Sequence, residues 1–156
     1  MTRSEKFIPK ILFNEGNSKV TNDPNDSGGL TKYGISQKSY PKLDIVNLTK
    51  QDAILIYKKE YFDPCKIDSI NDEFLALHVF DFAVNAGNHR AIEILQSVAG
   101  VIADGIIGGQ TLNKVNSGSY VTQYKQARID FYKSIGVGKN AKFLNGWINR
   151  VNNLKL

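Results

Sequence analysis

Apolar residues recur at helical spacing along most of this chain, and one polar, glycine-rich stretch between residues 17 and 35 interrupts the pattern. The end of the chain is an example, because Phe143, Trp147 and Val151 are four residues apart and fall on one face of a helix. The stretch 17–35 instead has the Asn, Asp, Pro and Gly content of turns, with few strand-forming residues. The pattern predicts a mainly α (α+β) fold with one small, irregular β-hairpin near the N-terminus.

Capping and stop signals place the individual helices. Ser4 is the expected N-cap of a first helix, which stops at Gly16 and carries Phe7 and Ile11 on its apolar face. Three later helices are expected to begin at Ser36, after the Thr49–Asp52 capping box, and at Asn71. A fourth follows an Asn88 cap and stops at Gly100, and a short fifth begins at about Thr111. The last two are expected over 120–135 and 140–153.

Composition limits the classes of protein that this chain can belong to. A chain of 156 residues can bury a core without disulfides or metals, and a single cysteine, Cys65, excludes an internal disulfide. One cysteine and two histidines, His78 and His89, do not form a metal-binding pattern, so neither a metal nor a cofactor is expected. The net charge of +5 favours an anionic partner, although scattered charge of this size also serves solubility alone.

The sequence predicts no stable membrane insertion. The most apolar stretch near the start, 7–13, contains Pro9 and Lys10 and is far shorter than the roughly 20 residues of a membrane span. It is also too interrupted for the apolar region of a secretory signal peptide. We therefore expect a protein made in the cytoplasm without a signal peptide.

The densest polar group is Glu15 together with the loop from Asp23 to Thr31. A carboxylate at the end of an apolar helix is expected to be partly desolvated, which raises its pKa and suits it to donate a proton near neutral pH. A second carboxylate in the loop would complete the pair that glycosidic bond cleavage requires. The alternative is a solvated helix end followed by ordinary turn residues.

The order of motifs along the chain resembles one family. Residues 14–16 read Asn-Glu-Gly, 22–36 read NDPNDSGGLTKYGIS, 79–87 read VFDFAVNAG and 104–108 read DGIIG. This is similar to glycoside hydrolase family 108, whose signature is EGG followed by NDPxDxGGxTxxGIS. The sequence departs from the family at Asn17, which replaces the second glycine, and at Phe62, which replaces a tryptophan.

The resemblance implies a lysozyme-like fold in one domain spanning 1–156. Its catalytic half would be 1–87, and its peptidoglycan-binding-like half, 88–156, would share the same core. The implied activity is that of an N-acetylmuramidase, found among phage endolysins and secretion-linked bacterial muramidases. Such an enzyme cleaves the β-1,4 bond between N-acetylmuramic acid and N-acetylglucosamine, and Glu15 is its general acid. The expected partner is bacterial peptidoglycan rather than nucleic acid, and a monomer is expected.

The roles of the other site residues are less narrowly defined. Asp26, five residues before Thr31, is the better candidate for orienting water with that threonine, and Asp23 is the alternative; each also fits a turn or strand role. Tyr33 beside the loop is expected to stack on a sugar, and Trp147 is a weaker candidate. The last two residues with a predicted substrate-binding role, Asp81 and Asn85, share a helical face. They form either the floor of a cleft or a buried hydrogen-bonded pair that ties the helix to a loop.

Three other functions compete with hydrolysis. A lytic transglycosylase cleaves the same bond with one glutamate and no water-positioning carboxylate, which Asp23, Asp26 and Thr31 argue against. A non-catalytic wall-binding protein is disfavoured by the retained Glu15, and a nucleic-acid binder is supported only by charge. Because the substrate lies outside the membrane, we expect action in the periplasm or extracellular space after holin-type or dedicated export.

Overall fold

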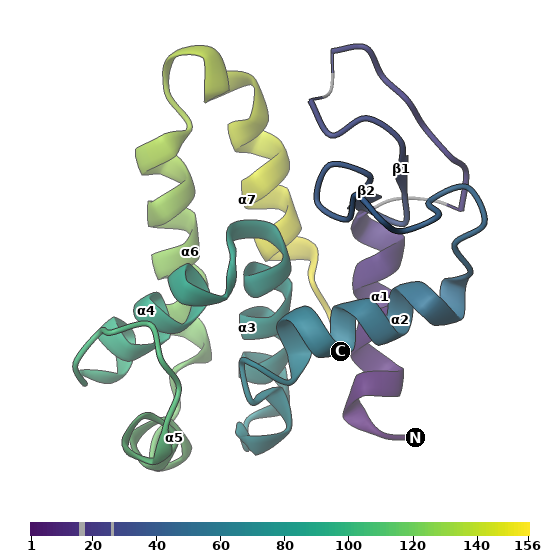
Figure 1. The fold of residues 1–156 in the computed structure, drawn as a ribbon. Helices are drawn as coiled ribbons and strands as arrows, with labels where there is room; N and C mark the ends of the chain where they lie inside the picture. The colour runs from purple at the N-terminus through teal and green to yellow at the C-terminus, as the bar shows by residue number, and fades with distance from the viewer. Residues whose placement is uncertain (16–17, 26) are drawn as a thin grey trace. The chain divides into compact units, whose positions relative to one another are not determined.

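Helices make up most of the chain, as the apolar spacing predicts (Figure 1). The computed structural model describes residues 1–15, 18–25 and 27–156, which divide into two units, Met1–Glu60 and Tyr61–Leu156. The sheet found in these residues is small, two-stranded and antiparallel, and it lies near the N-terminus. The predicted mainly α fold with a small β element is confirmed.

The first helix, α1 (Arg3–Glu15), buries the side chains of Phe7, Ile8, Ile11 and Leu12 and packs against α2 (Lys50–Tyr57). The prediction that Ser4 caps this helix is wrong. The Glu5 backbone N–H donates to the Thr2 hydroxyl oxygen (3.2 Å), and the Thr2 N–H donates to the Glu5 carboxylate (2.7 Å). This reciprocal capping box satisfies two backbone donors where Ser4 would satisfy one.

The predicted hairpin is confirmed. Strands β1 (Thr31–Lys32) and β2 (Ile35–Ser36) pair antiparallel, and the connection through Tyr33 (φ 53°) and Gly34 (φ 76°) has positive φ at both positions. Positive φ at both central residues is the mark of a type I′ turn. The helix predicted to begin at Ser36 is absent, because Ser36 pairs in β2 and its hydroxyl oxygen accepts from the Ser39 N–H (3.2 Å) in a turn.

The second half of the first unit contains α2. Its predicted capping box is confirmed, because the Thr49 hydroxyl accepts from the Asp52 N–H (3.1 Å) while the Asp52 carboxylate accepts from the Thr49 N–H (3.1 Å). A π-helical segment, η1 (Lys58–Phe62), follows α2 directly.

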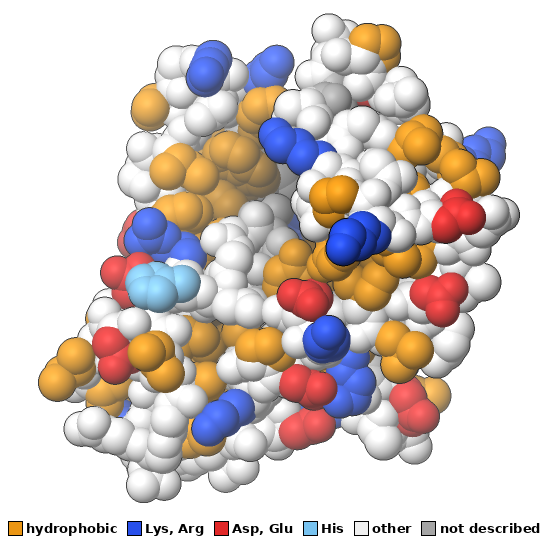
Figure 2. All heavy atoms as spheres, in the orientation of Figure 1, with side chains coloured by type: hydrophobic (Ala, Val, Ile, Leu, Met, Phe, Trp, Pro, Cys, Tyr) orange, Lys and Arg blue, Asp and Glu red, His pale blue; other side chains and the backbone are white. Residues whose placement is uncertain are grey.

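The core of the second unit is built around α3 (Glu73–Ala86). Every side chain from Leu75 to Ala83 is buried, and α4 and α6 both pack on α3, while α7 packs on α6. Hydrophobic side chains also gather on the surface over α6 and α7 (Figure 2). The other elements are η2 (Ile67–Ser69), α4 (Asn88–Ala99), α5 (Gly109–Asn116), α6 (Val121–Ile135), η3 (Gly138–Phe143) and α7 (Leu144–Asn153).

Helix ends in this unit follow the predictions in part. Gly100 ends α4 in the left-handed region and Gly136 ends α6, as expected. Asn71 does not begin α3, because the carboxylate of Asp72 accepts from two backbone N–H groups of the first turn. Asn88 is the first residue of α4 rather than its cap, and the backbone reverses at Gly87 (φ 92°). The predicted helix over 140–153 is split into η3 and α7.

Two findings concern the environment of the chain. Within the described ranges, no helix has both the length and the apolar character that crossing a membrane requires. Cys65 is buried, and burial raises the pKa of its thiol to about 12, so the thiol stays protonated.

Candidate active site

Glu15 is the last residue of α1, so the packing of α1 on α2 fixes the position of its backbone. The apolar stripe of α1 is buried from Phe7 to Leu12, which leaves this part of the helix little freedom to rotate. Gly16, Asn17 and Asp26 lie outside the described residues, and for Glu15 the description covers the backbone. The predicted catalytic roles of Glu15 and Asp26 therefore stay predictions.

Thr31 is held in place by pairing on both sides of β1. Its backbone exchanges hydrogen bonds with Thr21 (2.9 and 2.8 Å), and its strand partner is Ser36. The half-buried Thr31 hydroxyl donates to the Gly29 carbonyl oxygen (3.2 Å). A hydroxyl whose proton is used in this way keeps its oxygen lone pairs available to accept from a water molecule.

Asp23 is exposed, and its Oδ1 accepts from the Asn25 N–H (2.9 Å). This contact is the Asx-turn that the sequence left open as its alternative role. The second carboxylate oxygen stays available for other partners in such a turn. The choice between Asp23 and Asp26 as the second carboxylate stays a prediction.

Tyr33 occupies a backbone conformation that costs an L-residue about 1–2 kcal/mol. The Tyr33 carbonyl oxygen accepts from the hydroxyl of Tyr57 (3.0 Å), a buried residue of α2, so the turn is tied to the helix beside it. The ammonium of Lys32 lies 5.7 Å from the centre of the Tyr33 ring and also donates to the Val46 carbonyl oxygen (3.0 Å). The structure thus places a half-buried aromatic ring beside a cation next to Thr31.

Asp81 belongs to the second unit and is fully buried in α3. Its carboxylate accepts from Arg128 Nη2 (2.7 Å) and from Arg150 Nη2 (2.8 Å). Burial raises the pKa of Asp81, but the two guanidinium groups outweigh burial and hold the pKa below its usual value. The carboxylate is therefore ionised, and it links α3 to α6 and α7.

Asn85, one turn further along α3, accepts a hydrogen bond from the hydroxyl of Tyr132 in α6. Both side chains are hydrogen-bonded as the structural alternative predicted, but Asn85 is half-buried and the partners lie on α6 and α7 rather than in a loop. Their predicted contact with substrate stays a prediction.

His78 completes this buried group. Arg128 Nη1 lies 2.9 Å from His78 Nδ1, and because a guanidinium can only donate, Nδ1 must be the acceptor and the ring neutral. Burial and the neighbouring Arg128 lower the pKa of His78 to about 3. His78 therefore serves as a buried acceptor, and no three His, Cys, Asp or Glu side chains among the described residues cluster as a metal site would require.

Gln96 is a buried residue that the sequence analysis did not single out. Its amide nitrogen has two protons to donate and lies within hydrogen-bonding distance of three acceptors: Asp104 Oδ1 (2.8 Å), the Ile106 carbonyl oxygen (3.0 Å) and the Thr111 hydroxyl oxygen (3.1 Å). Its amide oxygen accepts from the Gly105 N–H (2.8 Å). Gln96 thus orders the Asp-Gly-Ile-Ile-Gly turn, and a polar residue on the buried face of a predicted helix was the available signal.

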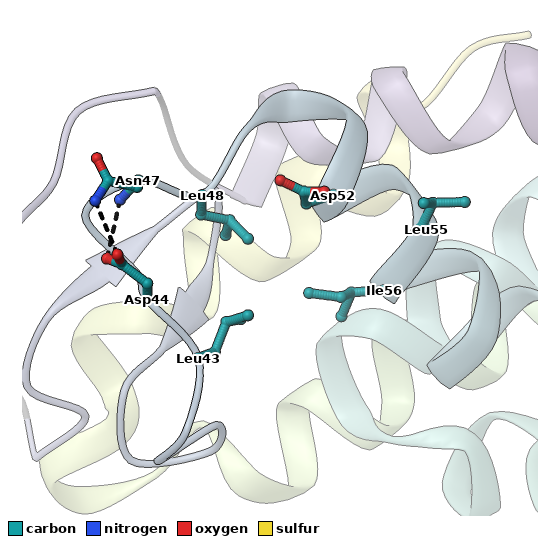
Figure 3. Close-up of a pocket in the computed structure, with 7 residues that line it drawn as sticks. All are labelled: Leu43, Asp44, Asn47, Leu48, Asp52, Leu55 and Ile56. Carbon is teal, nitrogen blue, oxygen red and sulfur yellow. Dashed lines mark hydrogen bonds between the residues drawn. The ribbon is translucent and has the colours of Figure 1, made fainter.

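A groove of about 470 Å³ lies in the first unit, between the 43–48 loop and α2 (Figure 3). Hydrogen bonds from Asn47 lower the pKa of Asp44, and those from Thr49 lower the pKa of Asp52. Both carboxylates are therefore poor proton donors near neutral pH. The residues that line the groove, none of them a predicted site residue, are Leu43, Asp44, Asn47, Leu48, Asp52, Leu55 and Ile56.

Comparison with known proteins assigns both parts of the chain. Residues 8–87 match the model of the glycosyl hydrolase 108 family, and residues 90–152 match a predicted peptidoglycan domain. The structure of SagA from Brucella abortus is similar with a TM-score of 0.81 and 30% identity, over 96% of this chain and 90% of that one. No curated protein sequence matches.

The two matched segments together support a peptidoglycan hydrolase, with peptidoglycan as its partner. The first match covers more than half of the 156 residues and includes every predicted catalytic residue. The resemblance found in the sequence is confirmed, and the chain belongs to the glycosyl hydrolase 108 family.

Proposed function

We propose that this protein is an N-acetylmuramidase that cleaves the β-1,4 bond between N-acetylmuramic acid and N-acetylglucosamine. The observation that carries the proposal is the family match over residues 8–87, which contains Glu15 at the end of α1 and Thr31 in β1. Glycosidases of most families work with a pair of carboxylic groups, one acting as the acid. The segment holds Glu15 as the acid and Asp23 or Asp26 as its partner.

In this mechanism Glu15 donates its proton to the bridging oxygen as the bond from that oxygen to C1 of N-acetylmuramic acid breaks. Asp26, with the Thr31 hydroxyl oxygen as a second acceptor, orients the water whose oxygen forms the new bond to C1. The proton lost by this water passes to the Asp26 carboxylate. Exchange with solvent then returns a proton to Glu15 and removes one from Asp26, so each turnover consumes one water and yields a reducing N-acetylmuramic acid end. Tyr33 stacks on a sugar ring beside the reacting bond.

Digestion of purified peptidoglycan tests the assignment of Glu15. The wild type is expected to release reducing N-acetylmuramic acid ends, identified by mass spectrometry, and Glu15→Gln is expected to lose at least 100-fold in rate, roughly the contribution of a general acid. Asp68→Asn, which replaces an exposed carboxylate in the second unit with an amide, is the control and is expected to keep full rate.

The product ends also separate the competing functions. Anhydro ends would mean a lytic transglycosylase, and undigested peptidoglycan with retained binding would mean a wall-binding protein. Full activity in Glu15→Gln would remove the catalytic role of Glu15. Comparing Asp23→Ala with Asp26→Ala identifies the second carboxylate, because only the residue that orients water is expected to be needed for turnover.

The proposed substrate sets the place of action. Peptidoglycan lies outside the cytoplasmic membrane, so we propose that the protein reaches the periplasm or the extracellular space through a holin-type pore or a dedicated exporter. Expression in a bacterial cytoplasm is expected to leave cells intact until such a pore is co-expressed. Lysis without a pore would contradict this route.

A further inference from the structure

We propose that a row of four aromatic rings on α6, η3 and α7, all of which except the buried Tyr132 reach the surface, forms a binding site for the glycan strand of peptidoglycan. The rings, called the aromatic row below, are those of Phe131, Tyr132, Trp147 and Phe143. This inference rests on the proposed function, because it takes peptidoglycan as the ligand. It adds a sugar-binding surface within the second unit, whereas the predicted catalytic residues belong to the first.

The rings follow one another at near-contact distances. Their centres are 5.8 Å apart from Phe131 to Tyr132, 5.3 Å from Tyr132 to Trp147 and 5.8 Å from Trp147 to Phe143. The planes of Tyr132 and Trp147 are inclined by 25°, and those of Trp147 and Phe143 by 31°. Phe131 is instead tilted by 59° to Tyr132, and Phe82 packs edge-to-face against Tyr124, Phe131 and Tyr132, at 64° to 74°.

The row is anchored from beneath and open at its end. Tyr132 is 1% exposed, donates its hydroxyl proton to Asn85 and packs edge-on against Phe82. Trp147 is half-buried, and Phe143 is 47% exposed. Because the Trp147 ring is packed against the anchored Tyr132, it loses little conformational freedom when a ligand covers its exposed part, which favours affinity.

Cations flank the row at both ends. The ammonium of Lys142 lies 5.1 Å from the centre of the Phe143 ring, and the guanidinium carbon of Arg90 lies 5.1 Å from the centre of the Phe131 ring. An exposed cation–π contact is worth about 0.5–1 kcal/mol, so Lys142 can move to an anionic group at small cost. Arg90 is held more firmly, because it also forms an ion pair with Glu93 (3.1 Å). Figure 2 shows Lys or Arg side chains over the connection between α6 and α7, beside the hydrophobic surface.

The aromatic rings and the flanking cations together match the chemistry of a peptidoglycan glycan strand. Pyranose rings have an apolar face of C–H groups that stacks on aromatic rings, and peptidoglycan carries carboxylates on its lactyl groups and peptides. An aromatic surface with cations at its ends complements such an anionic sugar polymer. The whole row and both cations also fall within residues 90–152, which match the predicted peptidoglycan domain.

Binding to intact peptidoglycan sacculi tests the proposal, with the full chain carrying Glu15→Gln so that the sacculi persist. Phe143→Ala and Phe143→Leu are both expected to weaken binding at least fivefold, while Phe143→Tyr stays within twofold, because the flat ring is what the sugar contacts. Lys142→Ala is expected to weaken binding and to flatten its dependence on salt. Ile102→Ala removes an isoleucine that is 77% exposed in the same unit and is expected to bind as the parent does.

Three outcomes would overturn the proposal. In the first, Phe143→Ala binds sacculi as strongly as the parent protein. In the second, Phe143→Leu binds as strongly as Phe143→Tyr. In the third, Ile102→Ala loses as much binding as Phe143→Ala. Thermal unfolding midpoints confirm that each variant is folded. A parallel assay of the variants with intact Glu15 on a soluble tetrasaccharide of the glycan measures bond cleavage by itself. If no variant cleaves it but Phe143→Ala still loses binding, the proposed function fails and the aromatic row stands.

Discussion

At Tyr33 the backbone conformation and the side chain have opposite preferences. The φ of 53° suits Gly or Asn, and the following Gly34 completes a type I′ turn for which Asn-Gly is the favoured pair. The Tyr57 hydroxyl holds the turn through its hydrogen bond to the Tyr33 carbonyl. A strained aromatic residue two positions after Thr31 is consistent with a role in binding rather than in folding.

Replacing Tyr33 with Asn separates these roles. We expect Tyr33→Asn to keep the free energy of unfolding or raise it by up to about 1 kcal/mol, since Asn tolerates positive φ. Peptidoglycan turnover is expected to fall at least fivefold because the stacking ring is lost. Urea unfolding and digestion rates measure the two effects, and Tyr33→Phe, which keeps the ring, is expected to keep turnover. A destabilised variant with normal turnover would contradict both statements.

His78 gives stability a pH dependence. The pKa of the folded-state ring is lowered to about 3, whereas an unfolded histidine has a pKa of about 6.5. Below about pH 6.5 the His78 ring binds a proton in the unfolded chain but stays neutral in the folded chain. The stabilisation is therefore complete above that pH and is lost as the pH falls toward 3, by up to about 1.4 kcal/mol per pH unit.

Urea unfolding between pH 7.5 and 4.5 measures this loss. His78→Gln places an amide oxygen where it can accept from Arg128 but cannot titrate, so its stability is expected to vary less over the same range. His89 is present in both proteins and therefore does not contribute to the difference between them. Equal slopes in the two proteins would show that His78 does not cause the dependence.

At the scale of elements, two neighbouring residues, Asn71 and Asp72, are candidates for the N-cap of α3. The Asp72 carboxylate accepts from the N–H groups of Phe74 and Leu75 (3.0 Å each). Asp72→Ala is therefore expected to lower the free energy of unfolding by about 1 kcal/mol. Asn71 takes part through its backbone N–H, which donates to Asn116, so Asn71→Ala is expected to change stability by less than about 0.5 kcal/mol. A larger loss at Asn71 in urea unfolding would contradict the assignment.

Most of the elements were predictable because their signals are local. Helical spacing, the Thr49–Asp52 box and the glycine stop at Gly100 act within a few residues of the chain. The errors fell where two local signals compete, such as Ser4 against the Thr2–Glu5 box, or where a strand partner outweighed a cap, as at Ser36. Propensity could not decide these cases because each alternative offers local hydrogen bonds of its own, and residue propensities are weak compared with such contacts.

The second unit crosses the boundary between the two matched segments. α3 lies in the segment that matches the hydrolase family, yet it packs on α4 and α6 from the segment that matches the peptidoglycan domain. The buried Arg128 of α6 finds its partner Asp81 on α3. The more general prediction that one core joins 1–87 with 88–156 stays a prediction.

Fragments test this packing. Residues 61–156, which include α3, are expected to unfold cooperatively on heating, whereas 88–156 are expected to lack a cooperative transition. Without α3, Arg128 loses its buried partner, a change that costs about 3–5 kcal/mol in comparable cases. Circular dichroism during heating measures both fragments, and a cooperative transition in 88–156 would contradict the expectation.

The sequence by itself determined the helical class, the hairpin, the family and the candidate residues Glu15, Asp23, Asp26 and Thr31, because each is written in short-range spacing or in a contiguous motif. Only the tertiary structure decided which distant side chains meet. Asp81 and Arg128 pair across 47 residues, and Tyr132 stacks on Trp147 from a different helix. Such contacts depend on how helix faces pack, and local spacing indicates which face is buried but not which partner covers it.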